Sequence, residues 1–262
     1  MLSIVSTLPI FDVGEGPAVL LLHGAPTTPE HMYPLGRSLS DAYRVLIPAL
    51  PGYGGTPALR PYDLDRSHAL VEQALLERGV QRLFIAGFSG GAYRAIALAC
   101  RGQLRVDGLI CLAGFGDFTG EESERLQKTA AALRTGIDFA PLVTSVMLSP
   151  AGQRDPQAVA EVHAWARAVA SEPLAEELAA LAAGPDLRAA LAALGIPVLA
   201  RVGQLDLSVP PIRSERILQA VPTARLEVVP GVGHALLAED EAATILSVRA
   251  FLDACAAREA GT

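Results

Sequence analysis

The 262-residue chain has few cysteines and no long apolar run, and both shortages exclude classes of protein. Its three cysteines are odd in number and form no CxxC motif, which argues against a disulfide framework. We expect Cys100, Cys111 and Cys255 to be free thiols in a reducing, cytoplasmic compartment. No apolar run reaches the roughly 18 residues of a membrane-spanning helix, so we expect no membrane partner.

The charge and the beginning of the chain exclude further classes. The formal net charge of −7 disfavours nucleic acid as a partner, because nucleic acid requires a clustered basic face. Residues 1–16 have no basic n-region and are interrupted by Asp12 and Glu15, so we expect no signal peptide. The chain has no G-x-G-x-x-G or P-loop motif and no ligand cluster with metal spacing, which predicts neither cofactor nor metal.

Short apolar segments alternate with helix-like segments along most of the chain. This alternation predicts an α/β fold with a mostly parallel, doubly wound sheet and helices on both faces. We expect strands near residues 9–13, 18–22, 44–48, 83–87, 107–113, 197–202 and 225–229. We expect helices near residues 30–39, 64–78, 90–101, 211–219 and 240–256.

One long segment, residues 118–185, interrupts this alternation. It is rich in Ala, Leu and Glu and shows no convincing strand pattern. We expect four helices in it, near residues 121–135, 139–148, 156–170 and 173–183. The predicted core therefore consists of residues 1–117 and 186–262, with a helical insertion between them.

Ser89 follows an apolar strand and is flanked by Gly87 and Gly91. This G-x-S-x-G spacing predicts a sharp strand-to-helix turn that exposes the serine oxygen. Glycine is needed on each side because a Cβ there would collide with the neighbouring backbone. The pattern favours a nucleophilic serine, and the alternative is a plain glycine-rich turn.

A nucleophilic serine requires a base. For a serine at such a strand-to-helix turn, the base is a histidine that follows later in the chain. Of the five histidines, His234 lies in a glycine-bounded loop just after the predicted strand 225–229. From such a loop its side chain could reach Ser89, whereas His163 lies within a helix-like stretch. We expect His234 to be the general base and His23 to be a structural residue.

The base in turn requires an acid that orients it. Asp206 lies just beyond the predicted strand 197–202 and 28 positions before His234, which leaves room for one helix and one strand. Active-site residues of open α/β sheets gather at the carboxyl ends of strands. Asp117 also follows a predicted strand, 107–113, and it remains an alternative acid.

Two backbone N–H groups could hold the oxyanion of a tetrahedral intermediate. One is that of Gly90, directly after the candidate nucleophile, and the other comes from a loop after an earlier strand. The loop His23-Gly24-Ala25-Pro26 follows the apolar segment 17–22, so we expect Ala25 to supply the second donor.

Together these motifs resemble the α/β-hydrolase superfamily over about residues 17–255. The motifs are His23-Gly24, Pro51-Gly52-Tyr53-Gly54-Gly55-Thr56, Gly87-Phe88-Ser89-Gly90-Gly91, Gly203-Gln204-Leu205-Asp206 and Gly233-His234. The resemblance implies a serine hydrolase and argues against relatives with an aspartate nucleophile. It also implies that residues 118–185 form a cap, or lid, over the active site.

The residues expected to bind substrate are large and apolar. Phe88 and Phe115 lie beside the predicted site, and Trp165 and Met147 lie in the insertion. Phe118 and Phe139 are further large apolar residues of the insertion, and the alternative for all four insertion residues is that they pack it on the core. Few charges accompany them, which favours a small or medium, mostly apolar ester, thioester or lactone as the acyl substrate. An acyltransferase, a C–C bond hydrolase or lyase and a ligand-binding module remain alternatives, and the chain could be a monomer or a homodimer.

Overall fold

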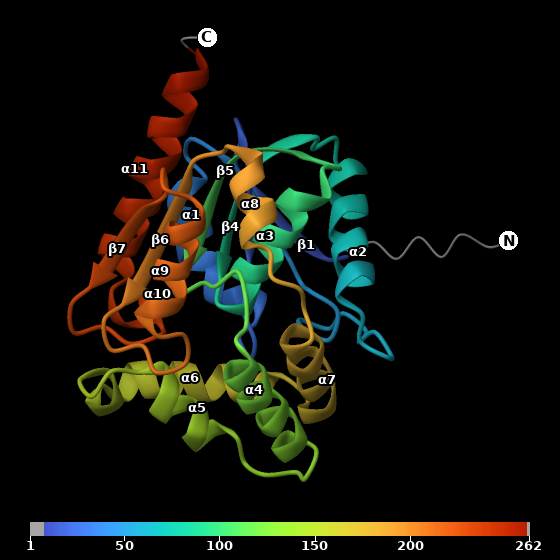
Figure 1. Cartoon of the computed structure of the whole chain (residues 1–262), viewed down its shortest axis with the longest axis vertical. Helices are drawn as coiled ribbons and strands as arrows, with labels where there is room; N and C mark the ends of the chain where they lie inside the picture. The colour runs from blue at the N-terminus through green and yellow to red at the C-terminus, as the bar shows by residue number, and fades with distance from the viewer. Residues whose placement is uncertain (1–7, 261–262) are drawn as a thin grey trace, which may run out of the picture.

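The computed structural model describes residues 8–260 and contains one seven-stranded sheet in that range (Figure 1). Its strands are β1 (Ile10–Val13), β2 (Ala18–Leu22), β3 (Arg44–Pro48), β4 (Arg82–Phe88), β5 (Arg105–Leu112), β6 (Val198–Gly203) and β7 (Arg225–Val229). They lie in the order β1-β3-β2-β4-β5-β6-β7. All neighbours are parallel except the edge strand β1, which is antiparallel to β3. The predicted mostly parallel sheet is therefore confirmed.

Side chains of the central strand β4 alternate between two apolar cores, as the two-residue period of a strand requires. Leu83 and Ile85 belong to one core, whereas Phe84, Ala86 and Phe88 belong to the other. Helices cover both faces, as predicted. The first face carries α2 (Leu64–Leu76), α3 (Gly90–Arg101), α8 (Arg188–Leu194) and α9 (Pro211–Ala220). The second face carries η1 (Pro29–Met32), α1 (Tyr33–Leu39), α10 (Leu236–Glu239) and α11 (Glu241–Ala260).

Residues 118–185, called the cap segment below, contain four α-helices, and the structure describes all of this range. These are α4 (Gly120–Leu133), α5 (Ala140–Met147), α6 (Pro156–Ala168) and α7 (Ser171–Ala182), with a short η2 (Gly152–Arg154) after α5. Figure 1 shows them gathered below the sheet, where α4 packs on α7 and α5 packs on α6. Their positions agree with the four predicted helices.

A buried ion pair joins the cap segment to the core. A guanidinium nitrogen of Arg94 on α3 lies 2.6 Å from a carboxylate oxygen of Glu177 on α7, and both side chains are at most 2% exposed. The Tyr53 hydroxyl donates to the same carboxylate, and Arg94 also donates to the Tyr62 hydroxyl at 2.6 Å. Because each charge is compensated by hydrogen bonds, burial of this pair is tolerated.

Two kinds of feature are absent from residues 8–260. Within residues 8–260 no helix is long and apolar enough to cross a bilayer. The same range holds no group of three or more His, Cys, Asp or Glu side chains that could bind a metal ion. Residues 1–7, the first part of the stretch in which no signal peptide is expected, lie outside the described residues.

Candidate active site

Ser89 lies at the sharp turn between β4 and α3. Its backbone has φ 54° and ψ −121°, a conformation that non-glycine residues rarely adopt and that costs energy. A Cβ added to Gly87 would lie 2.2 Å from the Gly91 carbonyl oxygen, and one added to Gly91 would lie 2.4 Å from the Leu22 oxygen. Both flanking glycines are therefore needed for this turn. Strain of this kind is typical of functional residues.

His234 and Asp206 form a buried pair between two loops at the edge of the sheet. The Nδ1 atom of His234 lies 2.7 Å from Oδ2 of Asp206, and the two residues are 1% and 2% exposed. The other carboxylate oxygen of Asp206 accepts hydrogen bonds from the backbone N–H groups of Ser208 and Val209 at 2.9 and 2.7 Å. With Nδ1–H donating to the carboxylate, Nε2 of the neutral ring carries the lone pair that a base requires.

The alternative acid, Asp117, has different partners. One of its carboxylate oxygens accepts from Nε of Arg216 at 3.0 Å, and the other lies 3.5 Å from Arg188. Its backbone oxygen accepts from Arg213 at 2.7 Å. The geometry therefore pairs Asp206, and not Asp117, with His234.

The loop that carries His234 is hydrogen-bonded to the cap segment. The Met147 carbonyl at the end of α5 accepts from the N–H groups of His234 and Ala235 at 2.8 and 3.0 Å. The Glu239 carboxylate on α10 accepts from the N–H of Gly233 at 2.8 Å and from that of Ser149 at 2.9 Å. The position of the imidazole therefore depends on the packing of α5 as well as on the sheet.

The loop after β2 packs directly on the serine turn. A Cβ on Gly24 would lie 2.7 Å from the Phe88 carbonyl oxygen and 2.9 Å from the Ser89 Cβ, so only glycine allows this approach. The backbone nitrogen of Ala25 lies 3.9 Å from the position that a Cβ on Gly90 would take. The two expected oxyanion donors, Ala25 and Gly90, are thus brought together beside Ser89.

His23 stabilises this loop from inside. Its Nδ1 donates to the Gly24 carbonyl at 3.1 Å, and its Nε2 accepts from the N–H of Leu50 at 3.4 Å. Burial lowers the pKa of His23 to about 4, so the ring is neutral near pH 7. These contacts agree with the structural role expected for His23.

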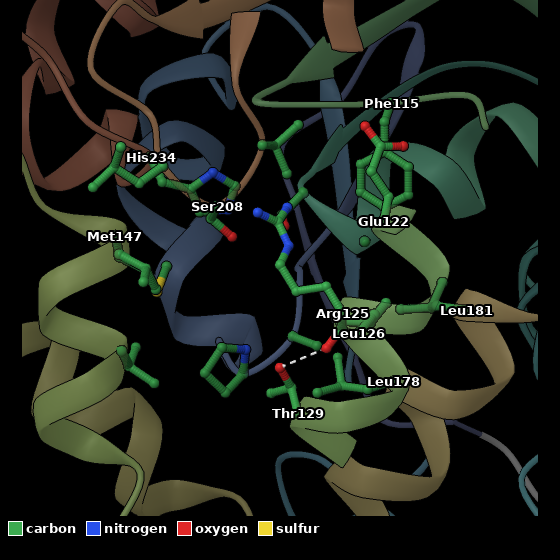
Figure 2. A pocket seen from close by; sticks show the side chains of 18 of the residues that line it. Phe115, Glu122, Arg125, Leu126, Thr129, Met147, Leu178, Leu181, Ser208 and His234 are labelled. Atoms are coloured by element: carbon green, nitrogen blue, oxygen red, sulfur yellow. Dashed lines mark hydrogen bonds between the residues drawn. The ribbon is translucent and has the colours of Figure 1, made fainter. Parts of the chain in front are cut away.

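A cavity of about 350 Å³ opens onto Ser89 and His234 (Figure 2). Ala25, Gly90 and the loop around Ser208 form its wall on the core side. The cap segment supplies most of the remainder, from one face each of α4, α5 and α7. These residues are Glu122, Arg125, Leu126, Thr129, Leu142, Val143, Val146, Met147, Leu174, Leu178 and Leu181. Their spacing of three and four positions within each helix is what places them on one face.

Two of the four residues expected to bind substrate line this cavity. Phe115 and Met147 do so, as do Phe118 and Phe139.

For Phe88 and Trp165 the expectation is corrected, because neither is among the residues that line the cavity. Phe88 is on the opposite face of β4 from Ile85, and its ring lies 4.6 Å from His31 and 4.9 Å from His234 between centroids. Trp165 also packs against His31, with its ring edge-on and the two ring centroids 4.4 Å apart. Both side chains belong to the core between the sheet and α6.

The cavity carries more charge than the sequence suggested. Among the residues that the structure describes, Glu122, Arg125 and Arg213 line it. Glu122 is paired with Arg216 at 2.7 and 2.9 Å, and Arg213 stacks over the ring of Phe115 at 4.0 Å from its centroid. Burial lowers the pKa of Arg213 to about 10, so it remains charged near neutral pH. The one-face spacing along α4 was the sequence signal that could have identified Arg125.

Comparison with known families agrees with this geometry. The model of the "Alpha/beta hydrolase family" matches residues 19–246. The chain belongs to this family. The predicted family and fold are therefore confirmed.

Curated relatives within the alpha/beta hydrolases are named esterases. A pimeloyl-[acyl-carrier protein] methyl ester esterase from Vibrio campbellii is 30% identical over 247 residues, which cover 91% of this chain and 95% of the relative. A protein of the same name from Aliivibrio salmonicida is 32% identical over 207 residues, covering 75% of this chain and 77% of the relative.

Solved structures of alpha/beta hydrolases superpose over nearly the whole chain. A thermophilic esterase from Thermogutta terrifontis has a TM-score of 0.86 at 24% identity, covering 95% of this chain and 93% of that one. An enol-lactonase from Burkholderia xenovorans has a TM-score of 0.83 at 22% identity, covering 94% and 96% of the two chains. At these identities the likeness establishes the fold.

Proposed function

We propose that this alpha/beta hydrolase cleaves carboxylic esters through an acyl-enzyme on Ser89. The observation that carries the proposal is the convergence on one cavity of Ser89, the ring of His234 and the loop of Ala25. The names of the esterase relatives support the same reaction. The acyl substrates are small or medium in size, because the cavity volume of about 350 Å³ is near the lower end for small-molecule sites.

The first half of the reaction forms the acyl-enzyme. His234 removes the proton from the Ser89 hydroxyl as the serine oxygen attacks the ester carbonyl carbon. The tetrahedral intermediate collapses, the bond to the alkoxy group breaks, and the imidazolium returns the proton to the departing alcohol. In the second half, His234 takes a proton from water as the water oxygen attacks the acyl-enzyme carbonyl. The bond to the Ser89 oxygen then breaks, the imidazolium returns the proton to that oxygen, and the carboxylic acid is released.

Asp206 acts on His234 and not on the substrate. The 2.7 Å hydrogen bond supports a role in holding the imidazole tautomer and stabilising the imidazolium. The two backbone N–H groups that already bind the other oxygen of Asp206 keep its carboxylate in place.

The backbone N–H groups of Ala25 and Gly90 stabilise the developing oxyanion, and the position of both beside Ser89 supports this. Such a donor typically contributes about 2.7–4 kcal/mol to lowering the barrier.

The cap segment, residues 118–185, shapes the acyl site in this proposal. The leucines of α7 and the valines of α5 line the cavity over Ser89, so filling it with substrate removes water from the oxyanion.

We also propose a reducing, cytoplasmic location. The three cysteines are unpaired, and burial raises the pKa of the Cys111 thiol to about 12.

Hydrolysis is tested by following proton release from methyl esters of increasing acyl length. The expected result is steady turnover that is abolished by Ser89→Ala, with circular dichroism and thermal unfolding unchanged in the variant. Turnover that survives Ser89→Ala would contradict the proposal. Acyl-enzyme that forms but reacts faster with an added alcohol or amine than with water would indicate acyl transfer.

A further inference from the structure

Among the described residues, one charged side chain that lines the cavity has no ion-pair partner. Within the described residues, the guanidinium of Arg125 on α4 makes no ion pair, although acidic residues lie near it on the same helix. Glu122 is held by Arg216, and Glu124 is held by Lys128 at 2.7 Å. Glu122 and Glu124 therefore already have cationic partners, and among the described residues no ion pair joins Glu121 to Arg125.

The side chain of Arg125 extends into the cavity. Figure 2 shows it reaching from α4 toward the end of the cavity at which Ser208 and His234 lie. Leu126 and Thr129 lie on the same face of α4 and line the same space. The Thr129 hydroxyl donates to the Arg125 carbonyl at 3.1 Å, so it is bound to the helix and offers no negative charge.

The part of the cavity wall that α5 and α7 form is apolar. Most lining residues from α5 and α7 are leucine, valine or methionine. Arg125 is exposed, so water solvates its guanidinium while the cavity is empty. A neutral acyl chain would displace that water without forming a hydrogen bond to the guanidinium. A carboxylate would instead form charge-assisted, bidentate hydrogen bonds with it.

We propose that the preferred substrate is an ester whose acyl part carries a free carboxylate, and that Arg125 binds this carboxylate. The substrate class is thus the half-ester of a small dicarboxylic acid. This inference rests on the proposed hydrolysis at Ser89 and narrows its substrate. Arg125 contributes to binding and specificity and takes no part in proton transfer.

The test compares matched esters that differ only in the distal group. Monomethyl glutarate and monomethyl adipate carry a carboxylate, and methyl 5-methylhexanoate and methyl 6-methylheptanoate replace it with an isopropyl group of similar shape. We expect the wild type to prefer the half-esters. Arg125→Gln should lower kcat/KM for the half-esters at least about tenfold, mainly through KM, and should lower kcat/KM for the neutral esters by a much smaller factor.

Arg167→Gln is the matched control, because Arg167 is an exposed arginine on α6 that does not line the cavity. This variant should leave kcat/KM unchanged for all four esters. Arg125→Glu should reverse the preference of the wild type. Equal kcat/KM for the half-esters and their neutral partners in the wild type would overturn the inference, as would an equal loss for both in Arg125→Gln.

Binding without turnover separates this inference from the proposed function. Calorimetric titration of monomethyl glutarate into Ser89→Ala should show binding that Arg125→Gln abolishes in the same background. That result, with no turnover by the wild type, would make the proposed hydrolysis wrong and leave the role of Arg125 supported. Binding that is unaffected by Arg125→Gln would refute the inference.

Discussion

Removing the charge of Glu177 should destabilise the protein far more than removing an exposed charge on the same helix. Arg94 is 1% exposed, so Glu177→Leu leaves its guanidinium buried without a counter-charge. Breaking a buried pair in this way typically costs about 3–5 kcal/mol of the free energy of unfolding. For a chain of this size each kcal/mol corresponds to about 2–4 °C, so the melting temperature should fall by about 6–20 °C.

The control is the Arg134–Glu172 pair, since Glu172 also lies on α7. Its charged atoms are 3.5 Å apart, and both side chains are more than 40% exposed. Exposed pairs of this kind contribute about 0–1 kcal/mol, so Glu172→Leu should change the free energy of unfolding by no more than that. Urea unfolding followed by circular dichroism measures both values.

A double-mutant cycle tests whether the loss arises from the pair itself. Arg94→Met should also be strongly destabilising, because it leaves the Glu177 carboxylate uncompensated. The double variant should be less destabilised than the sum of the single variants by at least about 2 kcal/mol, within the range of coupling energies for groups in contact. A loss below about 1 kcal/mol for Glu177→Leu, or additive single effects, would refute the reasoning.

The remaining predictions concern the acid and the pH dependence. Asp206→Asn should lower kcat by about 10⁴, the size of the equivalent change in a serine protease triad, whereas Asp117→Asn should leave kcat within a few-fold. The opposite order in steady-state assays would make Asp117 the acid. Burial lowers the pKa of His68 to about 3, below its unfolded value of about 6.5, so the unfolded state binds more protons between these values. The free energy of unfolding should therefore fall as the pH is lowered below about 6.5, and His68→Leu should reduce that slope by up to about 1.4 kcal/mol per pH unit in urea titrations. Parallel curves for the two proteins would contradict this assignment.

The strands and loops that carry the site could be predicted from local patterns. The apolar segment before Ser89, the glycines beside it and the loop position of His234 each depend on a few neighbouring residues. Backbone sterics of that kind can be read from the sequence, and the carboxyl ends of parallel strands then bring distant loops together. The short helix α10 (Leu236–Glu239) was not predicted, because four residues are too few for a helical period to appear.

The cavity wall was harder to predict, because it depends on how the cap helices pack. Phe88 was expected in the pocket for its closeness to Ser89, yet the two-residue period of β4 places it with Phe84 and Ala86 on the other face. Trp165 is as apolar as any pocket residue, and only tertiary packing on His31 places it in the core. The charge of Arg125 became relevant only once the structure placed α4 over the cavity.

Labelling with a fluorophosphonate probe is the most direct test of Ser89 as an activated nucleophile. The phosphonyl group should attach to Ser89 in one-to-one stoichiometry, as located by peptide mass spectrometry. Labelling should be slowed strongly by Asp206→Asn and abolished by Ser89→Ala. Absence of labelling in the folded wild type, or attachment at a residue other than Ser89, would contradict the account.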